Sequence, residues 1–183
     1  NSAGLFIGDA GWEPKELTPA RGLSSRQVMQ LALESCNSVD EAIDFINEAP
    51  KFGNNAGTMY LIADEKEAVI MEMGLKKSCL RTSEEGILVA SNVFLTSIAD
   101  EVEPPERKAL ERSNYIRDIL QKNEGKVDLG FVRRLLSDHH VPICNHDEVN
   151  TLRSIIVRTR EKKMIVSDGH PCASEFRQIH IPR

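Results

Sequence analysis

The sequence has no apolar run long enough to cross a membrane. Runs such as "AVIM" at Ala68–Met71 and "SIIV" at Ser154–Val157 fall far short of a transmembrane helix, which needs roughly 20 apolar residues. The N-terminus also lacks the basic stretch and apolar core of a signal peptide. We therefore expect a soluble, cytoplasmic protein with no membrane partner.

Basic residues are not in surplus either. The chain carries 23 Lys and Arg against 28 Asp and Glu, which gives a net charge of -5. No basic stripe interrupts this balance, whereas a nucleic-acid surface needs clustered positive charge. We therefore expect no nucleic-acid partner.

A cysteine framework is lacking as well. The four cysteines, Cys36, Cys79, Cys144 and Cys172, are spread along the chain without the spacing of a disulfide scaffold. Reduced thiols are the usual state in a cytosolic protein. We therefore expect free thiols rather than disulfides.

An initiating methionine is absent too. The chain begins at Asn1 and enters the apolar segment "GLFIG" almost at once. Natural domains rarely start inside such an element, so we expect that processing or truncation has removed a segment upstream of Asn1.

What is present is typical of a globular protein, with 183 residues, 40% of them hydrophobic and 28% charged. That length can bury a continuous core without disulfides or metals. The sequence has no internal repeat, and we expect a single domain over residues 1–183.

Four segments have helical patterns. Ser24 stands three residues before Gln27, and Ser38 stands three before Glu41, which is the spacing of a capping box at a helix start. Asp128 is placed to cap a later helix. The expected helices cover residues 24–36, 38–49, 104–122 and 129–139.

Seven segments read as strands. The clearest signal is a hairpin, in which two apolar runs flank the polar turn Asp64–Glu67. Paired helices between antiparallel strands favour an α+β layered fold over a doubly wound sheet. The expected strands cover residues 4–8, 58–63, 68–73, 86–92, 151–159, 164–169 and 175–182, with residues 9–22 and 94–103 as loops.

The stretch "SDHHVPICNHDE" at Ser137–Glu148 concentrates metal-ligating side chains. His139, His140, Cys144 and His146 are residue types that zinc accepts. The spacing matches no zinc ribbon or HExxH helix, and adjacent histidines of an extended segment point to opposite sides. A metal-binding module at these four residues stays open as an alternative, but we predict no metal and no cofactor.

Cys144 and His146 are also candidates for a nucleophilic pair, because a nearby imidazolium lowers the pKa of a thiol. Free cysteine is more often a small buried hydrophobe, and Cys144 follows Ile143, so we favour a structural role for it.

Two asparagines stand at the ends of expected strands. Asn1 precedes "SAGLFIG" and Asn92 closes "ILVASN". A preorganised amide can donate to an oxyanion, a contribution of about 3 to 4 kcal/mol, although most asparagines at such positions satisfy turns. "GHPC" at Gly169–Cys172 reads as a turn. Taken singly, these features identify no function.

Taken in order, the segments resemble a known family. "NSAGLFIG", "LSSRQVMQLALESCNSVDEAIDFI", "GTMYLIADEKEAVIMEMG", "VASNVF", "LLSDHHVPICNH" and "TLRSIIVRTREKKMIVSDGHPC" are similar to the carboxyl-terminal part of the acyl-coenzyme A:6-aminopenicillanic acid acyltransferase family. That family belongs to the N-terminal-nucleophile hydrolases, and the resemblance covers nearly all of the chain. It implies a four-layer αββα sandwich in which paired helices cover two antiparallel sheets.

The resemblance also implies a mechanism. A precursor of the family cuts itself before an internal cysteine, whose thiol becomes the nucleophile and whose own α-amine becomes the base. An α-amine with a pKa near 8 can accept a proton at neutral pH. We therefore expect an amide hydrolase or acyltransferase that forms an acyl-cysteine intermediate from a small-molecule amide or acyl-thioester.

Carried onto this chain, the resemblance assigns catalytic roles to three asparagines. Asn1 matches a residue that helps to form the oxyanion hole, and Asn92 matches one that contacts the reacting centre. Asn145 stands where the family's "I-C-R" segment has an arginine, and an uncharged amide cannot supply the same field. His146 and Thr151 fit as pocket or scaffold residues.

The family's nucleophilic cysteine should lie upstream of Asn1, so we expect a missing N-terminal segment or subunit as a partner. A homo-oligomer is also compatible with the sequence. A non-catalytic relative that serves in binding or assembly would explain both Asn145 and the missing nucleophile, and it stays the alternative.

Overall fold

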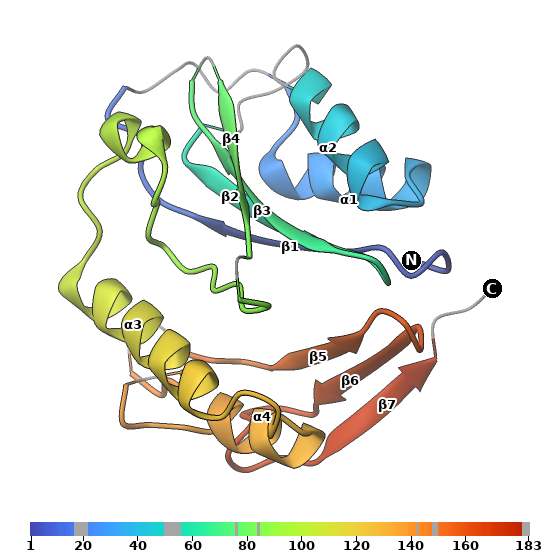
Figure 1. The fold of residues 1–183 in the computed structure, drawn as a ribbon. Coiled ribbons are helices and arrows are strands. Elements are labelled where there is room, and N and C mark those ends of the chain that lie inside the picture. The colour runs from blue at the N-terminus through green and yellow to red at the C-terminus, as the bar shows by residue number, and fades with distance from the viewer. Residues whose placement is uncertain are drawn as a thin grey trace.

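The structure is a computed structural model that describes residues 1–16, 22–49, 56–75, 77–83, 85–141, 143–147 and 150–180. Strands and helices alternate in groups along the chain (Figure 1). In chain order they are β1 (Phe6–Gly11), α1 (Ser25–Ser35), α2 (Val39–Glu48), β2 (Thr58–Ala63), β3 (Ala68–Met73), β4 (Ser78–Thr82), a 3-10 helix (Ser97–Glu101), α3 (Arg107–Lys122), α4 (Leu129–Leu136), β5 (Ile155–Arg158), β6 (Lys163–Ser167) and β7 (Phe176–His180).

The first sheet is antiparallel, with strand order β1-β2-β3-β4. β2 and β3 pair from Thr58 with Met73 to Ala63 with Ala68, so the predicted hairpin around residues 64–67 is confirmed. β1 pairs with β2 along its whole length, from Phe6 to Gly11.

This sheet is covered on both faces. Alternate side chains of a strand point to opposite faces, so Tyr60 and Ile62 pack with α1 and α2, whereas Met59 packs on the other side. There, Met59 and Ile70 contact Phe94, Ile98 and Val102 of the connection between β4 and α3. This packing holds the segment that follows Asn92 against the sheet.

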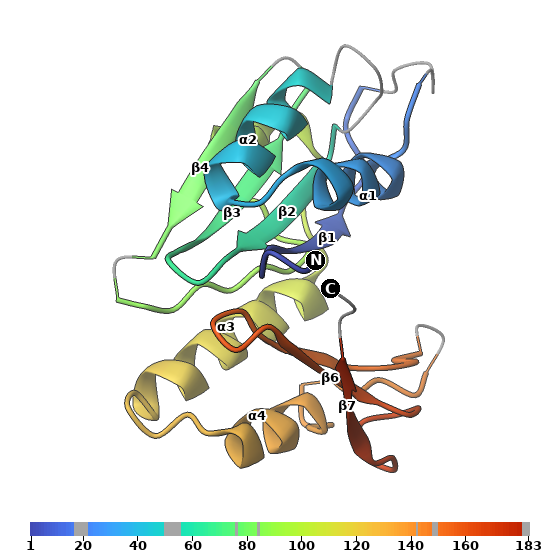
Figure 2. The same ribbon diagram turned by 90° about the vertical axis from the view of Figure 1, so that its right-hand side faces the viewer.

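The second sheet is antiparallel in the order β5-β6-β7. It lies with α3 and α4 in the lower half of Figures 1 and 2, while the first sheet and its two helices make the upper half. The Arg133 guanidinium of α4 lies 5.3 Å from the centre of the Phe176 ring in β7, which joins this helix to its sheet.

The described part of the chain therefore contains two antiparallel sheets and four α-helices, and the predicted α+β class is confirmed. None of these helices combines the length and the apolar character that crossing a bilayer requires.

The predicted strand at residues 86–92 is wrong. β4 occupies the edge of the sheet instead, where it pairs with β3 from Val69 with Thr82 to Met73 with Ser78. The apolar side chains of residues 86–92 therefore pack against the core without joining the sheet. Val89 is buried, and Leu88 packs against the core from an irregular segment. β4 escaped prediction because "SCLRT" is a polar, half-exposed edge strand.

Several element bounds also differ from the prediction: α3 begins at Arg107, α4 ends at Leu136, and β5 is shorter, at Ile155–Arg158. β1 runs to Gly11, into the expected loop, because Asp9, Ala10 and Gly11 continue the pairing with β2. A 3-10 helix lies inside the expected loop at 94–103. Residues 17–21, 50, 142, 148–149 and 181–182 lie outside the described part.

The predicted helix caps are confirmed. The Ser24 hydroxyl accepts from the Gln27 N–H and the Gln27 side chain accepts from the Ser24 N–H, which completes a capping box. Ser38 accepts from the Glu41 N–H, but the Glu41 carboxylate accepts from the Asn37 N–H, so only half of the predicted capping box forms there. Asp128 caps α4 by accepting from the Phe131 N–H at 2.6 Å.

Asp64 is expected to make stability depend on pH. Its partial burial alone would raise the pKa of the carboxyl group, but hydrogen bonds from the N–H groups of Lys66, Val39 and Glu67 outweigh burial and lower the pKa. A depressed folded-state pKa adds stability above the unfolded-state pKa, and that contribution is lost as pH falls through the folded value.

Asp64→Asn should therefore destabilise the protein most at neutral pH. The difference from wild type should shrink as pH drops below about 4, near the ordinary aspartate pKa. Urea unfolding from pH 7 into the acid range measures this. Glu65→Gln, in the exposed part of the same turn, is the control; an Asp64→Asn deficit that does not change with pH would contradict the assignment.

Candidate functional site

Asn1 has its whole amide engaged in backbone contacts. Its Nδ2 donates to the carbonyl oxygens of Leu33 at 2.9 Å and Cys36 at 2.8 Å, and its Oδ1 accepts from the N–H groups of Ala3 and Leu5. These contacts tie the start of the chain to the C-terminal end of α1. A role for Asn1 at a reacting centre stays a prediction.

Asn92 joins three parts of the fold. Its Nδ2 donates to the carbonyl oxygen of Gly11 at the end of β1, and its Oδ1 accepts from the Arg112 guanidinium of α3 at 3.3 Å. An amide nitrogen carries two hydrogens, so one N–H remains after the bond to Gly11. Asn92 is thus an oriented donor beside a cation.

The same end of β1 holds a second polar donor. The indole N–H of Trp12, the residue after Gly11, is buried and has no hydrogen-bond partner among the described residues. The Gly57 carbonyl oxygen accepts from the backbone N–H of Trp12 at 2.8 Å. Gly57 has a φ of +74°, and a Cβ there would collide with the Trp12 carbonyl oxygen. A glycine is required there.

Asn1 and Asn92 lie at opposite ends of β1. Asn1 contacts the residues just before the strand, and Asn92 contacts Gly11 at its end. Five residue steps of an antiparallel strand span about 17 Å. The structure therefore does not bring these two amides to one point.

Glu72 of β3 is a buried carboxylate beneath the segment after Asn92. It is 0% exposed, pairs with Arg81 at 2.7 Å and accepts from the N–H of Leu95, and from both the N–H and the hydroxyl of Thr96. It fixes the path of the chain just after Asn92. Glu72 was not among the predicted site residues; the signal that could have revealed it is its position as a lone acid in the apolar run "AVIMEM".

Asn145 and Thr151 form a local turn. The Asn145 Oδ1 accepts from the Asp147 N–H at 3.1 Å, and the Thr151 hydroxyl accepts from the Asn145 N–H at 2.9 Å while donating to the Ile143 carbonyl. These contacts close the loop on itself. They give Asn145 and Thr151 a scaffold position, and their predicted catalytic and pocket roles stay predictions.

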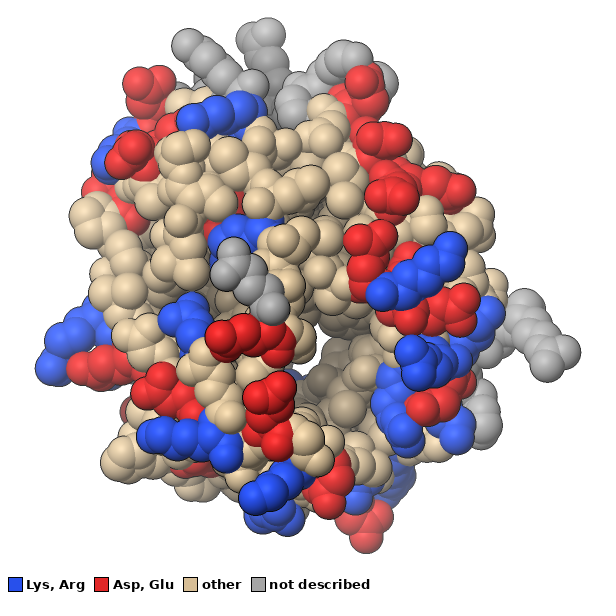
Figure 3. Space-filling model, viewed as in Figure 1, with Lys and Arg blue, Asp and Glu red and all other residues tan. Residues whose placement is uncertain are grey.

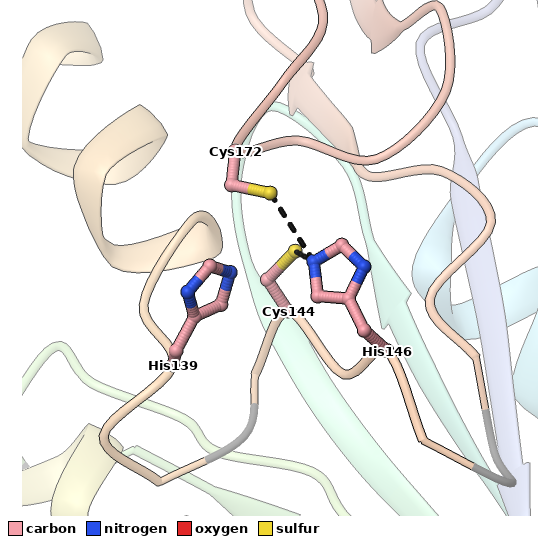
Figure 4. A group of neighbouring side chains, drawn as sticks. All are labelled: His139, Cys144, His146 and Cys172. Atoms are coloured by element: carbon pink, nitrogen blue, oxygen red, sulfur yellow. Dashed lines mark hydrogen bonds between the residues drawn. The ribbon is translucent and has the colours of Figure 1, made fainter.

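His146 belongs to a cluster with His139, Cys144 and Cys172 (Figure 4). Its Nε2 lies 3.4 Å from the Cys144 sulfur and 3.2 Å from the Cys172 sulfur. Burial raises the pKa of the Cys144 thiol, which disfavours the thiolate that a nucleophile needs. His140 lies outside the cluster and contacts the Tyr115 ring instead.

A cavity of about 330 Å³ lies between β1 and the β5–β6 pair. Its walls are mainly apolar, with Leu5, Ile7, Val157 and Met164 among them, and Asn1 is the predicted site residue that lines it. The face drawn in Figure 3 is hollowed between the two halves of the molecule. The cavity suits an apolar group.

A protein-family model matches the chain. The model of the family described as acyl-coenzyme A:6-aminopenicillanic acid acyl-transferase matches residues 1–172 of the 183, and no curated protein matches the chain. A family match over nearly the whole chain agrees with the resemblance read from the ordered segments, and it suggests activity of the acyltransferase or hydrolase type. The chain therefore belongs to the acyl-coenzyme A:6-aminopenicillanic acid acyltransferase family.

Proposed function

We propose that the protein transfers or hydrolyses an acyl group through an acyl-cysteine intermediate, with the nucleophilic cysteine supplied by sequence upstream of Asn1. The match of the family model over residues 1–172 carries this proposal. A small-molecule amide or an acyl-thioester would be the acyl donor. No cofactor is needed, because a cysteine thiol and an α-amine supply both nucleophile and base.

The fold proposed for this activity is the four-layer αββα sandwich. α1 and α2 pack on one face of the first sheet. The second sheet lies below the first one in both views, with α3 and α4 in the same half of the molecule (Figures 1 and 2). This order of elements supports a sandwich over 1–183 that upstream sequence completes.

The reacting centre is proposed at the Asn92 end of β1. The bond to Gly11 leaves the second N–H of Asn92 without an acceptor among the described residues, and the Arg112 guanidinium orients the amide. The buried indole N–H of Trp12, the residue after Gly11, is a further donor at this end of β1. Preorganised donors of this kind stabilise the negative charge that develops on a carbonyl oxygen during acyl transfer. Arg112 also supplies a positive charge, which Asn145 cannot.

Asn1 and Asn145 are then positioning residues. Asn1 anchors the start of β1 to α1, and Asn145 shapes the turn that Thr151 closes. His146 belongs to the Cys/His cluster, and its predicted pocket role stays a prediction. Because backbone groups use the whole Asn1 amide, whereas the bond to Gly11 uses only one N–H of Asn92, Asn92 is the better choice for contact with the substrate.

An acyl-enzyme intermediate can be tested by the partition of its acyl group between hydroxylamine and water. The full-length protein is supplied with several amides that share one acyl group but differ in the leaving amine, with hydroxylamine present as a competing acceptor. A common intermediate predicts one ratio of hydroxamate to free acid for all of them. A ratio that changes with the leaving amine, or no turnover of any amide or thioester, would overturn the proposal.

A further inference from the structure

A cluster of soft metal ligands lies between two connecting segments of the second half of the chain. His139, Cys144 and His146 come from the segment that follows α4, and Cys172 comes from the turn between β6 and β7. One ligand atom from each residue lies within 4.8 Å of the other three (Figure 4). The four side chains thus converge from segments that are far apart in the sequence.

The spacing of these atoms suits a tetrahedral ion. Zinc bonds of about 2.3 Å to sulfur and about 2.0 to 2.1 Å to nitrogen give sulfur–nitrogen edges of roughly 3.6 Å in a tetrahedron. The His146 Nε2 lies 3.4 Å from the Cys144 sulfur and 3.2 Å from the Cys172 sulfur. These two distances are thus close to the edges of a tetrahedral zinc site.

The position of His146 between two thiols favours a cation over hydrogen bonding alone. The Nε2 of a neutral imidazole carries either one hydrogen or one lone pair, so it can make one good hydrogen bond, as donor or as acceptor, to only one of the two sulfurs. An ion bound at the centre of the cluster would satisfy the nitrogen and both sulfurs at once. The fourth position falls to His139, whose ring lies 5.1 Å from the His146 ring, centre to centre.

Backbone and side-chain contacts outside the cluster hold its ligands in place. The carbonyl oxygen of Asp138 accepts from the Cys144 N–H at 3.0 Å. The Ser137 hydroxyl donates to the carbonyl oxygen of Pro171 at 2.9 Å, which joins the segment after α4 to the turn that carries Cys172. The ligand set is therefore supported before any ion arrives.

We propose that His139, Cys144, His146 and Cys172 bind one Zn²⁺ ion and that this ion fixes the segment after α4 to the β6–β7 turn. This inference is independent of the proposed acyl transfer. Two thiolates and two imidazoles are a ligand set that zinc takes in closed structural sites, and binding releases the two thiol protons to solvent. No carboxylate joins the cluster in the described part of the chain, which disfavours Ca²⁺ and Mg²⁺.

Access to the site is open. Cys144 is buried at the base, whereas His139, His146 and Cys172 are exposed. Zinc can therefore enter from solvent without opening the core.

The neighbouring His140 provides a matched control. It differs from His139 by one position but faces the Tyr115 ring, 5.7 Å away from centre to centre, and is outside the cluster. A specific site should lose zinc affinity when His139 is replaced but not when His140 is replaced. A surface that binds metal loosely through any imidazole would respond equally to both replacements.

The test uses the reduced, metal-free full-length protein. Cobalt(II) is added as a spectroscopic substitute for zinc, and zinc affinity is measured by competition with a chromophoric chelator. One ion per chain, with the absorption of thiolate-bound tetrahedral cobalt, is expected. Cys172→Ser and His139→Ala should each weaken zinc binding by at least about 10-fold, whereas His140→Ala should leave it unchanged.

Circular dichroism of the metal-free variants guards against loss of folding, and Cys79→Ser is the control for loss of a thiol outside the cluster. Equal zinc affinity in His139→Ala and His140→Ala would overturn the site. So would a reduced protein that binds no cobalt and, on air oxidation, forms a disulfide between Cys144 and Cys172.

Discussion

Replacing Glu72 with alanine is expected to lower the free energy of unfolding by about 3 to 5 kcal/mol. The carboxylate is fully buried, and its removal leaves the Arg81 guanidinium without its counter-ion. It also strands the N–H groups of Leu95 and Thr96 and the Thr96 hydroxyl. Each buried donor without a partner carries its own desolvation cost.

Two comparisons isolate the cause. Glu72→Gln keeps an acceptor oxygen and similar volume, so it should lose less than Glu72→Ala. Glu161→Ala breaks the solvent-exposed pair with Arg158 and should cost about 1 kcal/mol or less. Urea unfolding measures all three variants, and a Glu72→Ala loss as small as that of Glu161→Ala would contradict the role of Glu72 as a buried anchor.

Asn92→Ala is expected to lower kcat/KM by about 10² to 10³-fold, since it removes the proposed oxyanion donor. Arg112→Gln should give a smaller loss, because it removes the guanidinium that orients the amide but leaves the donor. The measurement is steady-state turnover of an amide that the full-length protein accepts.

Asn1→Ala tests whether Asn1 contacts the substrate or only supports the fold. It frees the carbonyl oxygens of Leu33 and Cys36, so it should cost about 1 to 3 kcal/mol of stability and reduce kcat/KM less than Asn92→Ala does. Asn114→Ala, on the exposed side of α3, is the neutral control. A greater loss of activity in Asn1→Ala than in Asn92→Ala would move the reacting centre to the other end of β1.

Local sequence rules predicted the parts of the fold that local contacts decide. The Ser24 capping box and the β2–β3 hairpin depend on residues within a few positions of one another, and both were predicted with the correct bounds. The same rules gave a wrong strand at residues 86–92, because an apolar run of strand length can pack against a sheet without joining it. Only the tertiary structure decides between these outcomes.

The candidate site depends on contacts between residues far apart in sequence, which spacing rules cannot reveal. Arg112 meets Asn92 across 20 residues, and Cys172 meets His146 across 26. The stretch Ser137–Glu148 supplied three of the four cluster residues, but the fourth proved to be Cys172 instead of His140. Adjacent histidines look equivalent in a sequence, and the path of the backbone separates them.

Intact-protein mass spectrometry tests the acyl-cysteine account most directly. The full-length protein is mixed with an amide substrate, quenched during turnover and digested to locate any adduct. An acyl-cysteine intermediate predicts a mass increase equal to the acyl group on a cysteine upstream of Asn1, and this adduct should accumulate less in Asn92→Ala. Turnover without any acyl adduct, or an adduct on Cys144 or Cys172 in place of the upstream cysteine, would contradict it.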